Sequence, residues 1–397
     1  MAVSRKDLHN ALDQCVRCGL CSASCPTYGL LREEGDSPRG RIALIQGFVE
    51  AQLSPSKTLR QHLDNCLGCR ACESVCPSLV PFGEILEEAR GRLLEEAPLR
   101  QHLGRRLLVE LFSSGAGVRV LPSIRTAYRF FRLSWLLHRL AVRWPLLGAL
   151  DRLAGLPLRL PQLPAPDPHA QIHLFTGCIG RAAQADALEA AVFVLRRLGY
   201  GIACSPMGHC CGALHRHNGL LRQADQHLTH IAQTDGQQML VGLASACVAE
   251  LGRDPRLNAQ ELCRFLADLP QPLPLRPFSG RVAIHVPCSQ RNALSDARAA
   301  ADLLSRIPQL QPLALPENDR CCGAAGTYLL RRPRLSQALL QPKLDALARL
   351  APDILVTTNP GCALHFAAGI RERGLGIPVL HPIELIARQL STELPEP

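Results

Sequence analysis

Eight of the 18 cysteines fall in two short runs that share one spacing. In each run three cysteines are separated by two residues, a fourth follows after three residues, and a proline comes next. A chain with this spacing can hold two [4Fe–4S] clusters, because the first three thiolates bind one cluster and the fourth reaches the other. The spacing predicts one cluster on Cys15, Cys18, Cys21 and Cys76, and a second on Cys66, Cys69, Cys72 and Cys25.

Two other uses of so many cysteines fit the pattern less well. A structural zinc site needs two pairs of ligands and not two quartets, and disulfide frameworks belong to short secreted chains. The 397-residue chain starts without an apolar signal segment. This favours a reducing cytoplasm, where thiolates stay available to metal. The two runs therefore predict a protein that transfers electrons.

A second group of cysteines occurs twice. Cys178 and Cys288 each end a short apolar segment, Cys-Cys-Gly follows at 210–212 and 321–323, and one more cysteine follows a later apolar segment. Partners are 110, 111 and 115 residues apart, and a nearly constant offset indicates duplication of one domain. The two sets of candidate metal ligands are Cys178, Cys210, Cys211 and Cys247, and Cys288, Cys321, Cys322 and Cys362.

Each copy predicts an α/β domain with a mostly parallel sheet. Apolar strand segments such as 172–178 and 282–288 alternate with helical stretches such as 182–198. Ligands bind at the carboxyl ends of the strands in open sheets of this kind, so the cysteines of each copy should converge on one point. Four thiolates suffice for a further iron–sulfur cluster or for zinc. The third alternative is a metal-free copy whose cysteines are merely buried.

Some residues near these motifs have an ordinary packing role as their first interpretation. Cys204 and Cys263 lie outside every motif and are expected to pack as small apolar side chains. His209, His285 and His365 lie within three residues of a motif cysteine and could tune a cluster by hydrogen bonding, although a packed histidine is the commoner case. Four arginines near the N-terminal runs could stabilise reduced clusters, with solvated surface positions as the default: Arg17, Arg39, Arg41 and Arg70.

The chain divides into four stretches. Apolar residues recur at helical spacing in 41–50 and 79–96, which predicts an N-terminal domain built from helices. Proline-rich stretches at 156–168 and 270–277 mark boundaries. The predicted division is 1–98 for a helical domain with two clusters, 99–168 for a basic helical segment and linker, and 169–277 and 278–392 for the duplicated domains.

The net charge of +10 is concentrated in the basic segment. Residues 99–160 contain eleven arginines, no lysine and two acidic residues. Within it, residues 133–150 place Trp135 and Trp144 among leucines and arginines, a composition that suits a membrane interface. The alternatives are docking to an acidic partner subunit and packing on the N-terminal domain. The missing lysines and the leucine-rich background count against nucleic acid, and no segment is apolar for long enough to predict a membrane span.

The order of these motifs resembles that of iron–sulfur proteins with duplicated CCG domains, a family that includes heterodisulfide reductase subunits. In that family the last cysteine usually belongs to a C-x2-C pair, and five thiolates then hold a non-cubane cluster. The first position of this pair is Ala244 in the first copy and Asn359 in the second. The missing fifth thiolate counts against a non-cubane cluster and against heterodisulfide chemistry.

Nearly the whole chain resembles the glycolate oxidase iron–sulfur subunit family, most specifically at 321–328, 359–362 and 381–385, with a further match at 38–41. The resemblance implies a multidomain α + α/β fold, with a helical ferredoxin domain followed by two α/β CCG domains. It also implies an FAD-binding partner flavoprotein that oxidises a 2-hydroxy acid, foremost glycolate. This chain would pass the electrons to quinone or another acceptor, without catalytic residues of its own.

The layout leaves other substrates open. Relatives with a similar layout serve glycerol-3-phosphate or lactate dehydrogenation, and a heterodisulfide-reductase-like enzyme acting at a CCG-domain cluster is the remaining alternative. No nicotinamide or flavin fingerprint occurs in the chain, and the glycine-rich run at 323–326 lacks the lysine and hydroxyl residue of a phosphate loop. We therefore expect a cytoplasmic subunit, peripheral at most on the inner face of the cytoplasmic membrane.

Overall fold

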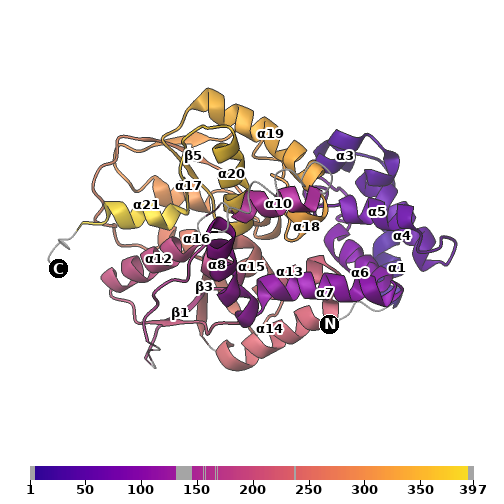
Figure 1. The fold of residues 1–397 in the computed structure, drawn as a ribbon, viewed down its shortest axis with the longest axis horizontal. Helices are drawn as coiled ribbons and strands as arrows, with labels where there is room; N and C mark the ends of the chain where they lie inside the picture. Colours follow the sequence, from indigo (N-terminus) through magenta and orange to yellow (C-terminus); the bar gives the residue numbers. More distant parts are fainter. Residues whose placement is uncertain are drawn as a thin grey trace.

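The structure is a computed structural model that describes residues 5–130 and 145–391, except positions 155, 157, 166, 168 and 237. Helices of the N-terminal region form one end of the molecule, and two α/β domains form the other (Figure 1). Helices of the basic segment run along both parts. Trp135 and Trp144, on which the predicted membrane interface depended, lie outside the described residues.

The N-terminal region consists of helices, and no strand occurs in described residues 5–98. Its core is formed by apolar side chains such as Leu12, Ile45 and Ile85, which recur on one face of successive helices. The helix starts are marked in the sequence: the Ser37 side chain accepts from the Gly40 amide at 2.9 Å, and Pro38 follows as the first helical residue. The helices are α1 (Arg5–Asp13), α2 (Cys21–Ser24), α3 (Pro26–Leu31), α4 (Pro38–Val49), α5 (Lys57–Asn65) and α6 (Phe82–Glu95), with a 3₁₀ turn at Glu34–Asp36.

The duplicated domains have the same sheet topology. The strand order is β2-β1-β3-β4 in the first copy and β6-β5-β7-β8 in the second, and every pair is parallel. The strands are β1 (Ile172–Phe175), β2 (Ile202–Cys204), β3 (Met239–Gly242), β4 (Asn258–Glu261), β5 (Arg281–Ile284), β6 (Gln311–Ala314), β7 (Ile354–Val356) and β8 (Val379–Leu380). The equal order confirms that the two copies are repeats of one fold.

The connections between the parallel strands are helical, as this topology requires. The predicted helix at 182–198 is divided in the structure into α11 (Ile179–Ala183) and α12 (Ala185–Arg197). The remaining helices of the first copy are α13 (Ala213–His217), α14 (Leu221–Asp235), α15 (Ser245–Leu251) and α16 (Leu262–Ala267). Those of the second are α17 (Ala299–Leu304), α18 (Tyr328–Arg331), α19 (Pro333–Leu350), α20 (Pro360–Glu372) and α21 (Pro382–Gln389), with a π-helical turn at Ser289–Ala293.

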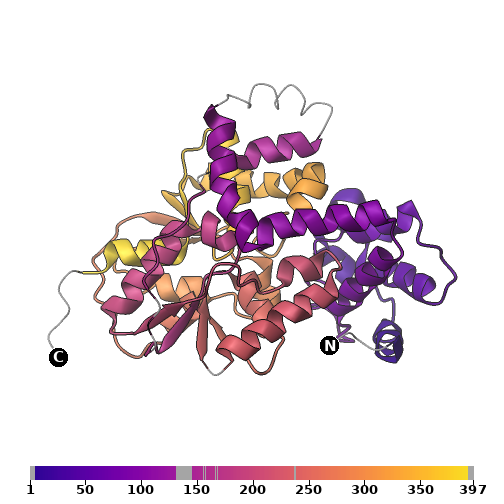
Figure 2. The same cartoon turned by 60° about the horizontal axis from the view of Figure 1, so that its bottom comes forward.

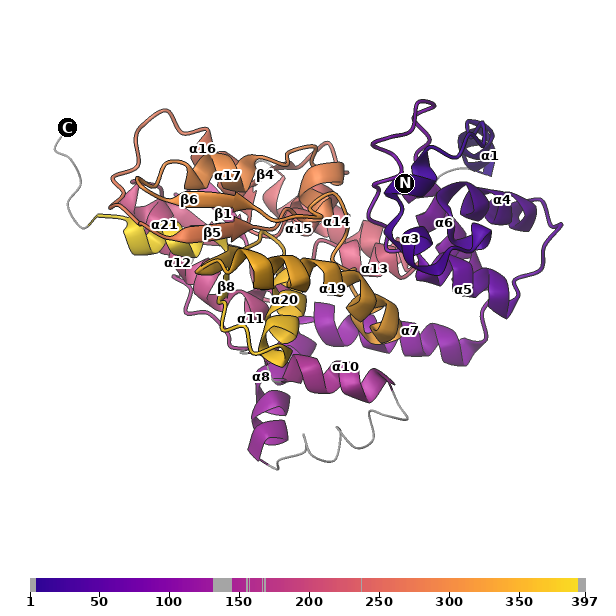
Figure 3. The same cartoon turned by 90° about the horizontal axis from the view of Figure 1, so that it is seen from above.

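The two copies share one apolar core. Leu195 of α12 and Leu266 of α16 belong to the same buried cluster as Leu303 of α17 and Ile383 of α21. Helix α21, at the end of the second copy, packs on α12 of the first, and Figure 3 shows the two helices side by side. A hydrogen bond also joins the copies: Nε2 of His381 donates to the Leu243 carbonyl at 3.1 Å. The copies therefore form a single packed unit.

The basic segment lies across the molecule. It forms α7 (Leu99–Ser113), α8 (Gly115–Phe130) and α10 (Pro145–Ala154), and Figure 2 shows α7 running from the N-terminal helices to the first copy. Val109 is buried against Leu94 and Leu220, so one face of α7 packs between the two parts. Among the described residues no single helix is both long and apolar enough to cross a membrane, but α7 and the part of α8 up to Tyr128, bent by 78°, pass together by length and composition only.

Candidate functional site

The first cysteine run forms a loop that faces Cys76 of the second run. Arg17 and Gly19, on either side of Cys18, have φ angles of 57° and 84°, so the chain turns sharply around the middle cysteine. Cys15, Cys18, Cys21 and Cys76 all line one small cavity. Burial raises the pKa of the Cys21 thiol, and the neighbouring Cys15 and Cys18 sulfurs raise it further.

The second run repeats this local geometry. Gly68 and Arg70 flank Cys69 with φ angles of 63° and 59°. Burial raises the pKa of Cys72, and the sulfurs of Cys69, Cys66 and Cys25 raise it further. Cys25 thus lies near the sulfurs of the second run, and Cys76 lines the cavity of the first run together with Cys72. The assignment of four cysteines to each cluster stays a prediction. Each quartet is a suitable set of thiolates for a [4Fe–4S] cluster.

The two quartets differ in exposure. Cys18 is exposed, and the apolar side chains around the first run reach solvent, with Val16, Leu20 and Leu79 at 69%, 61% and 80% exposure. Cys25 and Cys66 of the second quartet are buried. The first quartet is therefore accessible to another protein, whereas the second lies inside the molecule.

Two buried arginines lie beside the second quartet. Arg41 is fully buried, contrary to the surface position expected for it, and its guanidinium lies 3.8 Å from the Cys25 sulfur and 2.9 Å from the Asp36 carboxylate. Arg90 donates to the carbonyl of Cys66 at 2.6 Å. Burial favours the neutral form of Arg41, but the Cys66 and Cys25 sulfurs and Asp36 outweigh it and raise its pKa. Arg41 and Cys25 are 16 residues apart in the sequence, and this separation does not indicate that they are in contact.

The cysteines of the first CCG copy converge, as predicted. The Cys178 and Cys210 sulfurs are 3.8 Å apart, and Cys211 contacts both Cys210 and Cys247. Contact with Cys210 and burial both raise the pKa of Cys178. Crowded, buried thiols of this kind become thiolates when a cation compensates their charge. The donor set therefore fits a bound metal or cluster.

The second copy has the same arrangement. The Cys288 and Cys321 sulfurs are 3.8 Å apart, and Cys322 contacts both Cys321 and Cys362. Gly323 has a φ angle of 94°, and its amide points to the Cys321 sulfur at 3.4 Å, as the Gly212 amide does to Cys210. A Cβ at position 323 would lie 2.6 Å from the Ser336 carbonyl oxygen. This explains why glycine follows each cysteine pair.

The residues that replace the fifth cysteine of the family, Ala244 and Asn359, occupy equivalent places in the two copies. Ala244 and Asn359 each precede a helix, α15 and α20, and both line the cavity between the copies. The Asn359 side chain accepts from the Gly361 amide at 3.0 Å and so caps its helix. Each copy therefore offers four sulfurs.

One cavity of about 270 Å³ connects these sites. Cysteines of both copies line it, and so does Cys69 of the second ferredoxin run. Burial raises the pKa of Cys69, and the Cys288 sulfur raises it further. The Asn292 amide donates to the Cys69 carbonyl at 2.7 Å, and the Tyr328 hydroxyl donates to the Asn65 carbonyl at 3.1 Å. The second quartet therefore adjoins the second copy, a contact that sequence reasoning did not predict.

The histidines singled out from the sequence are buried or half-buried, and one of them, His285, lies within 4.8 Å of the Cys322 and Cys362 sulfurs. His285 shares a hydrogen bond with the Thr357 hydroxyl at 3.0 Å, and His365 is 3.1 Å from the Ser336 carbonyl. Burial lowers the pKa of His365 to about 4. The ring of His209 meets that of His230 edge to face and lies 3.7 Å from Asp235. Cys263 is fully buried and Cys204 is half-buried, both outside the cysteine sets.

Sequence reasoning missed two other histidines, His215 and His227, which lie beside Cys210. A signal was present, because five of the 14 histidines fall between positions 209 and 230. The remaining near-cluster arginines behave as expected. Arg17 is exposed, and Arg39 and Arg70 are partly exposed partners of Glu34 and Glu73.

Family models match most of this architecture. One described as a 4Fe-4S dicluster domain matches residues 11–80, and one described as a cysteine-rich domain, CCG, matches residues 172–252 and 282–367. They confirm the fold class, a ferredoxin region followed by two CCG domains, and they confirm iron–sulfur clusters as cofactors.

Curated relatives match over nearly the full length. The glycolate oxidase iron–sulfur subunit of Escherichia coli (strain K12) is 31% identical, covering 96% of this chain and 95% of its own. The probable glycolate oxidase iron–sulfur subunit of Bacillus subtilis (strain 168) is 29% identical, covering 91% and 89%. A fumarate reductase (CoM/CoB) subunit from Methanothermobacter marburgensis is 26% identical, covering 94% and 71%. The chain is thus an electron-transferring subunit of an oxidoreductase, and it belongs to the family of glycolate oxidase iron–sulfur subunits with two CCG domains.

Proposed function

We propose that this chain carries electrons from a flavoprotein partner that oxidises a 2-hydroxy acid, foremost glycolate, to quinone or another acceptor. Oxidation of such an acid to the 2-oxo acid releases two electrons and two protons. [4Fe–4S] clusters supply one-electron transfer over a wide range of potentials. The observation that carries the proposal is the series of cysteine sets, from exposed Cys18 through half-buried Cys69 to Cys288 in the second copy.

The first quartet is the proposed docking point for the flavoprotein. Its cysteines are the most exposed, and Val16, Leu20 and Leu79 form an apolar rim around them. Exposed apolar side chains that border a functional group mark a protein interaction site. The names of the relatives, which are subunits, support the existence of such a partner.

The residues around the second quartet favour electron flow inward. The guanidinium of Arg41 is buried 3.8 Å from the Cys25 sulfur, and that of Arg90 is buried against the Cys66 carbonyl. Positive charge and hydrogen bonds to sulfur stabilise a reduced cluster. No described arginine is buried beside Cys15, Cys18 or Cys21, so electrons accepted there would move to the second quartet.

The exit is proposed to lie near a membrane surface. Exposed leucines follow one face of α7 at every fourth position, and exposed Arg100 and Arg106 flank them. The leucines are Leu99, Leu103, Leu107 and Leu111. An exposed apolar stripe beside arginines suits the interface of an anionic membrane, and this is the proposed route to quinone.

A second candidate function rests on the cavity between the copies. Cysteines from both copies line it, and its volume of about 270 Å³ approaches that of a small-molecule site. A small disulfide reduced there would take up two electrons and two protons. Only four sulfurs per copy are present, which counts against this chemistry. Lactate and glycerol-3-phosphate remain alternative substrates of the flavoprotein.

The proposal is tested by Cys18→Ser in the complex with its flavoprotein. We expect glycolate still to reduce the flavin, while electron transfer to a quinone analogue falls at least about tenfold. Cys204→Ser, outside every cysteine set, is the matched control and should transfer electrons as the wild type does. Unchanged transfer by Cys18→Ser would exclude the first quartet from the path. Reduction of the flavin by lactate or glycerol-3-phosphate, and not by glycolate, would reassign the substrate.

A further inference from the structure

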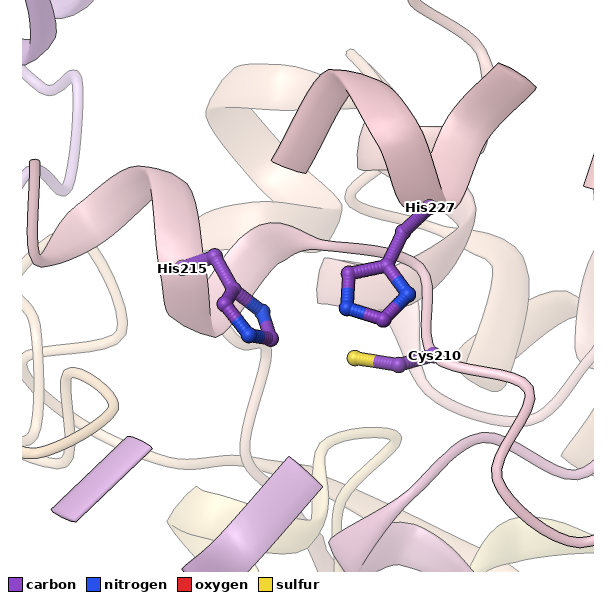
Figure 4. A group of neighbouring side chains, drawn as sticks. All are labelled: Cys210, His215 and His227. Carbon is purple, nitrogen blue, oxygen red and sulfur yellow. The ribbon is translucent and has the colours of Figure 1, made fainter. Parts of the chain in front are cut away.

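Two histidines lie beside one cysteine of the first CCG copy. His215 is on α13, His227 is on α14, and Cys210 precedes both in the loop after β2. One ligand atom of each side chain lies within 4.8 Å of those of the other two. Figure 4 shows the sulfur and the two rings around one common space. The chain separates these residues by up to 17 positions, so the packing of α13 on α14 brings them together.

The ring of His215 is buried without a hydrogen bond, although it contacts the ring of His227 and lies 3.8 Å from the Glu110 carboxylate. Its exposed fraction is 0%, and neither of its ring nitrogens makes a hydrogen bond. Buried polar groups in native proteins are almost always paired, because an unpaired one costs free energy. His285 and His365 illustrate the usual case, since each makes a hydrogen bond to a neighbouring oxygen. A bound cation is the partner that an imidazole and a thiolate share.

The second copy provides an internal comparison. Its cysteines follow those of the first at an offset of 111 residues, which aligns His215 with Gly326. Helix α19 has Ala338 and Leu339 where α14 has His227. The second copy thus keeps the sulfurs and lacks both imidazoles. The second copy instead places a different imidazole, that of His285, within 4.8 Å of the Cys322 and Cys362 sulfurs, and this ring is already hydrogen-bonded to Thr357.

We infer that the first CCG copy binds a mononuclear zinc ion through Cys210, His215 and His227, with Cys178 as the fourth ligand. Two thiolates and two imidazoles form a closed structural zinc site. Two sulfurs each about 2.3 Å from one tetrahedral ion are about 3.8 Å apart, and the Cys178 and Cys210 sulfurs are 3.8 Å apart. The same separation occurs in the second copy, so the sulfur distance does not distinguish the two copies. The assignment of zinc to the first copy therefore rests on His215 and His227.

A carboxylate lies behind the proposed ligand. Glu110 of α7 is 3.8 Å from Nε2 of His215. Histidines that bind zinc commonly hydrogen-bond a carboxylate through the other ring nitrogen, which fixes the ring and increases its basicity. The ion would therefore hold α13 and α14 together and attach α7, the helix with the exposed leucine stripe, to the first copy.

The proposal has a consequence for electron transfer. If zinc occupies Cys178 and Cys210, the first copy holds no iron–sulfur cluster on its four sulfurs, because two of them are used. Only the second copy, which adjoins Cys69, could then extend the path. The duplicated domains would have separate roles, one structural and one in electron transfer.

The first experiment measures metals and zinc coordination in the full chain purified without oxygen. We expect about one zinc per chain, and X-ray absorption at the zinc edge should show both sulfur at about 2.3 Å and nitrogen at about 2.0 Å. Absence of zinc, or a shell of sulfur alone, would overturn the proposal. This measurement uses the wild type, so it does not depend on whether variants fold.

The second experiment identifies the ligands. We expect His215→Ala and His227→Ala each to lower zinc content at least about tenfold after dialysis against a chelator, with iron unchanged. His230→Ala is the matched control, since His230 is exposed on the same helix as His227 and is not in the group. Loss of iron instead of zinc would assign a cluster to this copy and refute the inference. Unchanged zinc in both variants would refute it as well.

Discussion

Arg41 and Asp36 form a buried ion pair at the second cysteine quartet. Both side chains are 1% exposed, and their nearest charged atoms are 2.9 Å apart. Thr27 and the His62 carbonyl accept two more guanidinium hydrogens at 3.1 Å and 2.9 Å. Each guanidinium nitrogen thus has at least one acceptor, and hydrogen bonding of this kind is the condition under which a buried charge is tolerated. Its position beside the Cys25 sulfur gives it an electrostatic role as well.

Replacing Arg41 should therefore have two effects. We expect Arg41→Gln to lower the free energy of unfolding by about 3 to 5 kcal/mol, because Asp36 is left buried without its partner. The second cluster should also become harder to reduce, since a positive charge at sulfur is lost. Urea unfolding and a redox titration followed by electron paramagnetic resonance measure the two effects. Arg39→Gln, in the same helix but partly exposed, should change stability by less than about 1 kcal/mol; equal effects of both variants would contradict the prediction.

Buried neutral histidines make the fold sensitive to acid. Burial lowers the pKa of His381 and that of His365 to about 4, below the ordinary value of 6.5. Their stabilising contribution is complete above about pH 6.5 and is lost as the pH falls towards 4, because the unfolded chain binds the proton first. We expect a loss of about 1 kcal/mol per histidine at pH 5.5. Urea unfolding between about pH 8 and pH 5.5 checks this, and His381→Gln should reduce the slope; an unchanged slope would argue against His381.

Helix α7 has a different role on each of its faces. Val109 packs in the interior and Glu110 faces His215, while Leu99, Leu103 and Leu107 reach solvent at intervals of four residues. The sequence predicted a basic helical segment here. It could not show which face is covered, because that depends on the position of the N-terminal helices and the first copy.

The exposed stripe provides the prediction at this scale. We expect the chain to bind vesicles that contain anionic lipid, and Leu103→Gln with Leu107→Gln to weaken binding at least about tenfold, since two large side chains leave the interface. Flotation with and without anionic lipid measures the binding. Phe193→Gln, an exposed apolar residue on α12, is the control. If the paired variant instead lost the flavoprotein and kept its lipid binding, the stripe would be a subunit interface.

In the whole molecule Asp64 connects three parts of the chain. It lies on α5, accepts two hydrogen bonds from Arg105 of α7 at 3.1 Å and 2.9 Å, and pairs with Arg331 of α18. Burial opposes its charge, but Arg331 and Arg105 outweigh this and lower its pKa. One carboxylate thus joins the ferredoxin region, the basic segment and the second copy.

Removing this carboxylate should loosen the assembly. We expect Asp64→Asn to cost about 2 kcal/mol, because two charged hydrogen-bond donors lose their acceptor. Hydrogen exchange should increase in the loop around Cys69 and in the Ser289–Ala293 turn, which meet across this boundary. Asp268→Asn, which removes an exposed carboxylate, is the control. Increased exchange confined to α5 would mean that Asp64 acts only locally.

The cysteine sets could be predicted from the sequence because their geometry is local. Spacing within each run determines the loop, and a repeated strand topology places Cys178 and Cys288 at equivalent ends of parallel strands. The contact of Cys69 with the second copy could not be predicted, and the histidine-rich stretch at 209–230 indicated histidines near Cys210 without showing that His215 and His227 meet. Both contacts depend on the packing of whole domains and of two helices, and no periodicity in the sequence encodes either. The burial of Arg41 was missed for the same reason.

The crossing of Cys25 to the second quartet has a consequence for biosynthesis. Cys25 is synthesised 41 residues before Cys66, and the first quartet is incomplete until Cys76 has been made. Neither cluster can therefore be completed on a partly synthesised N-terminal region. Each cluster takes ligands from both cysteine runs and so joins the two ends of the segment between them. Because metal binding and folding are coupled in such domains, delivery of iron and sulfide should act as an all-or-none checkpoint. A cell short of iron would then contain subunits with both clusters and unfolded chains that are degraded, but few subunits with only one of the two clusters.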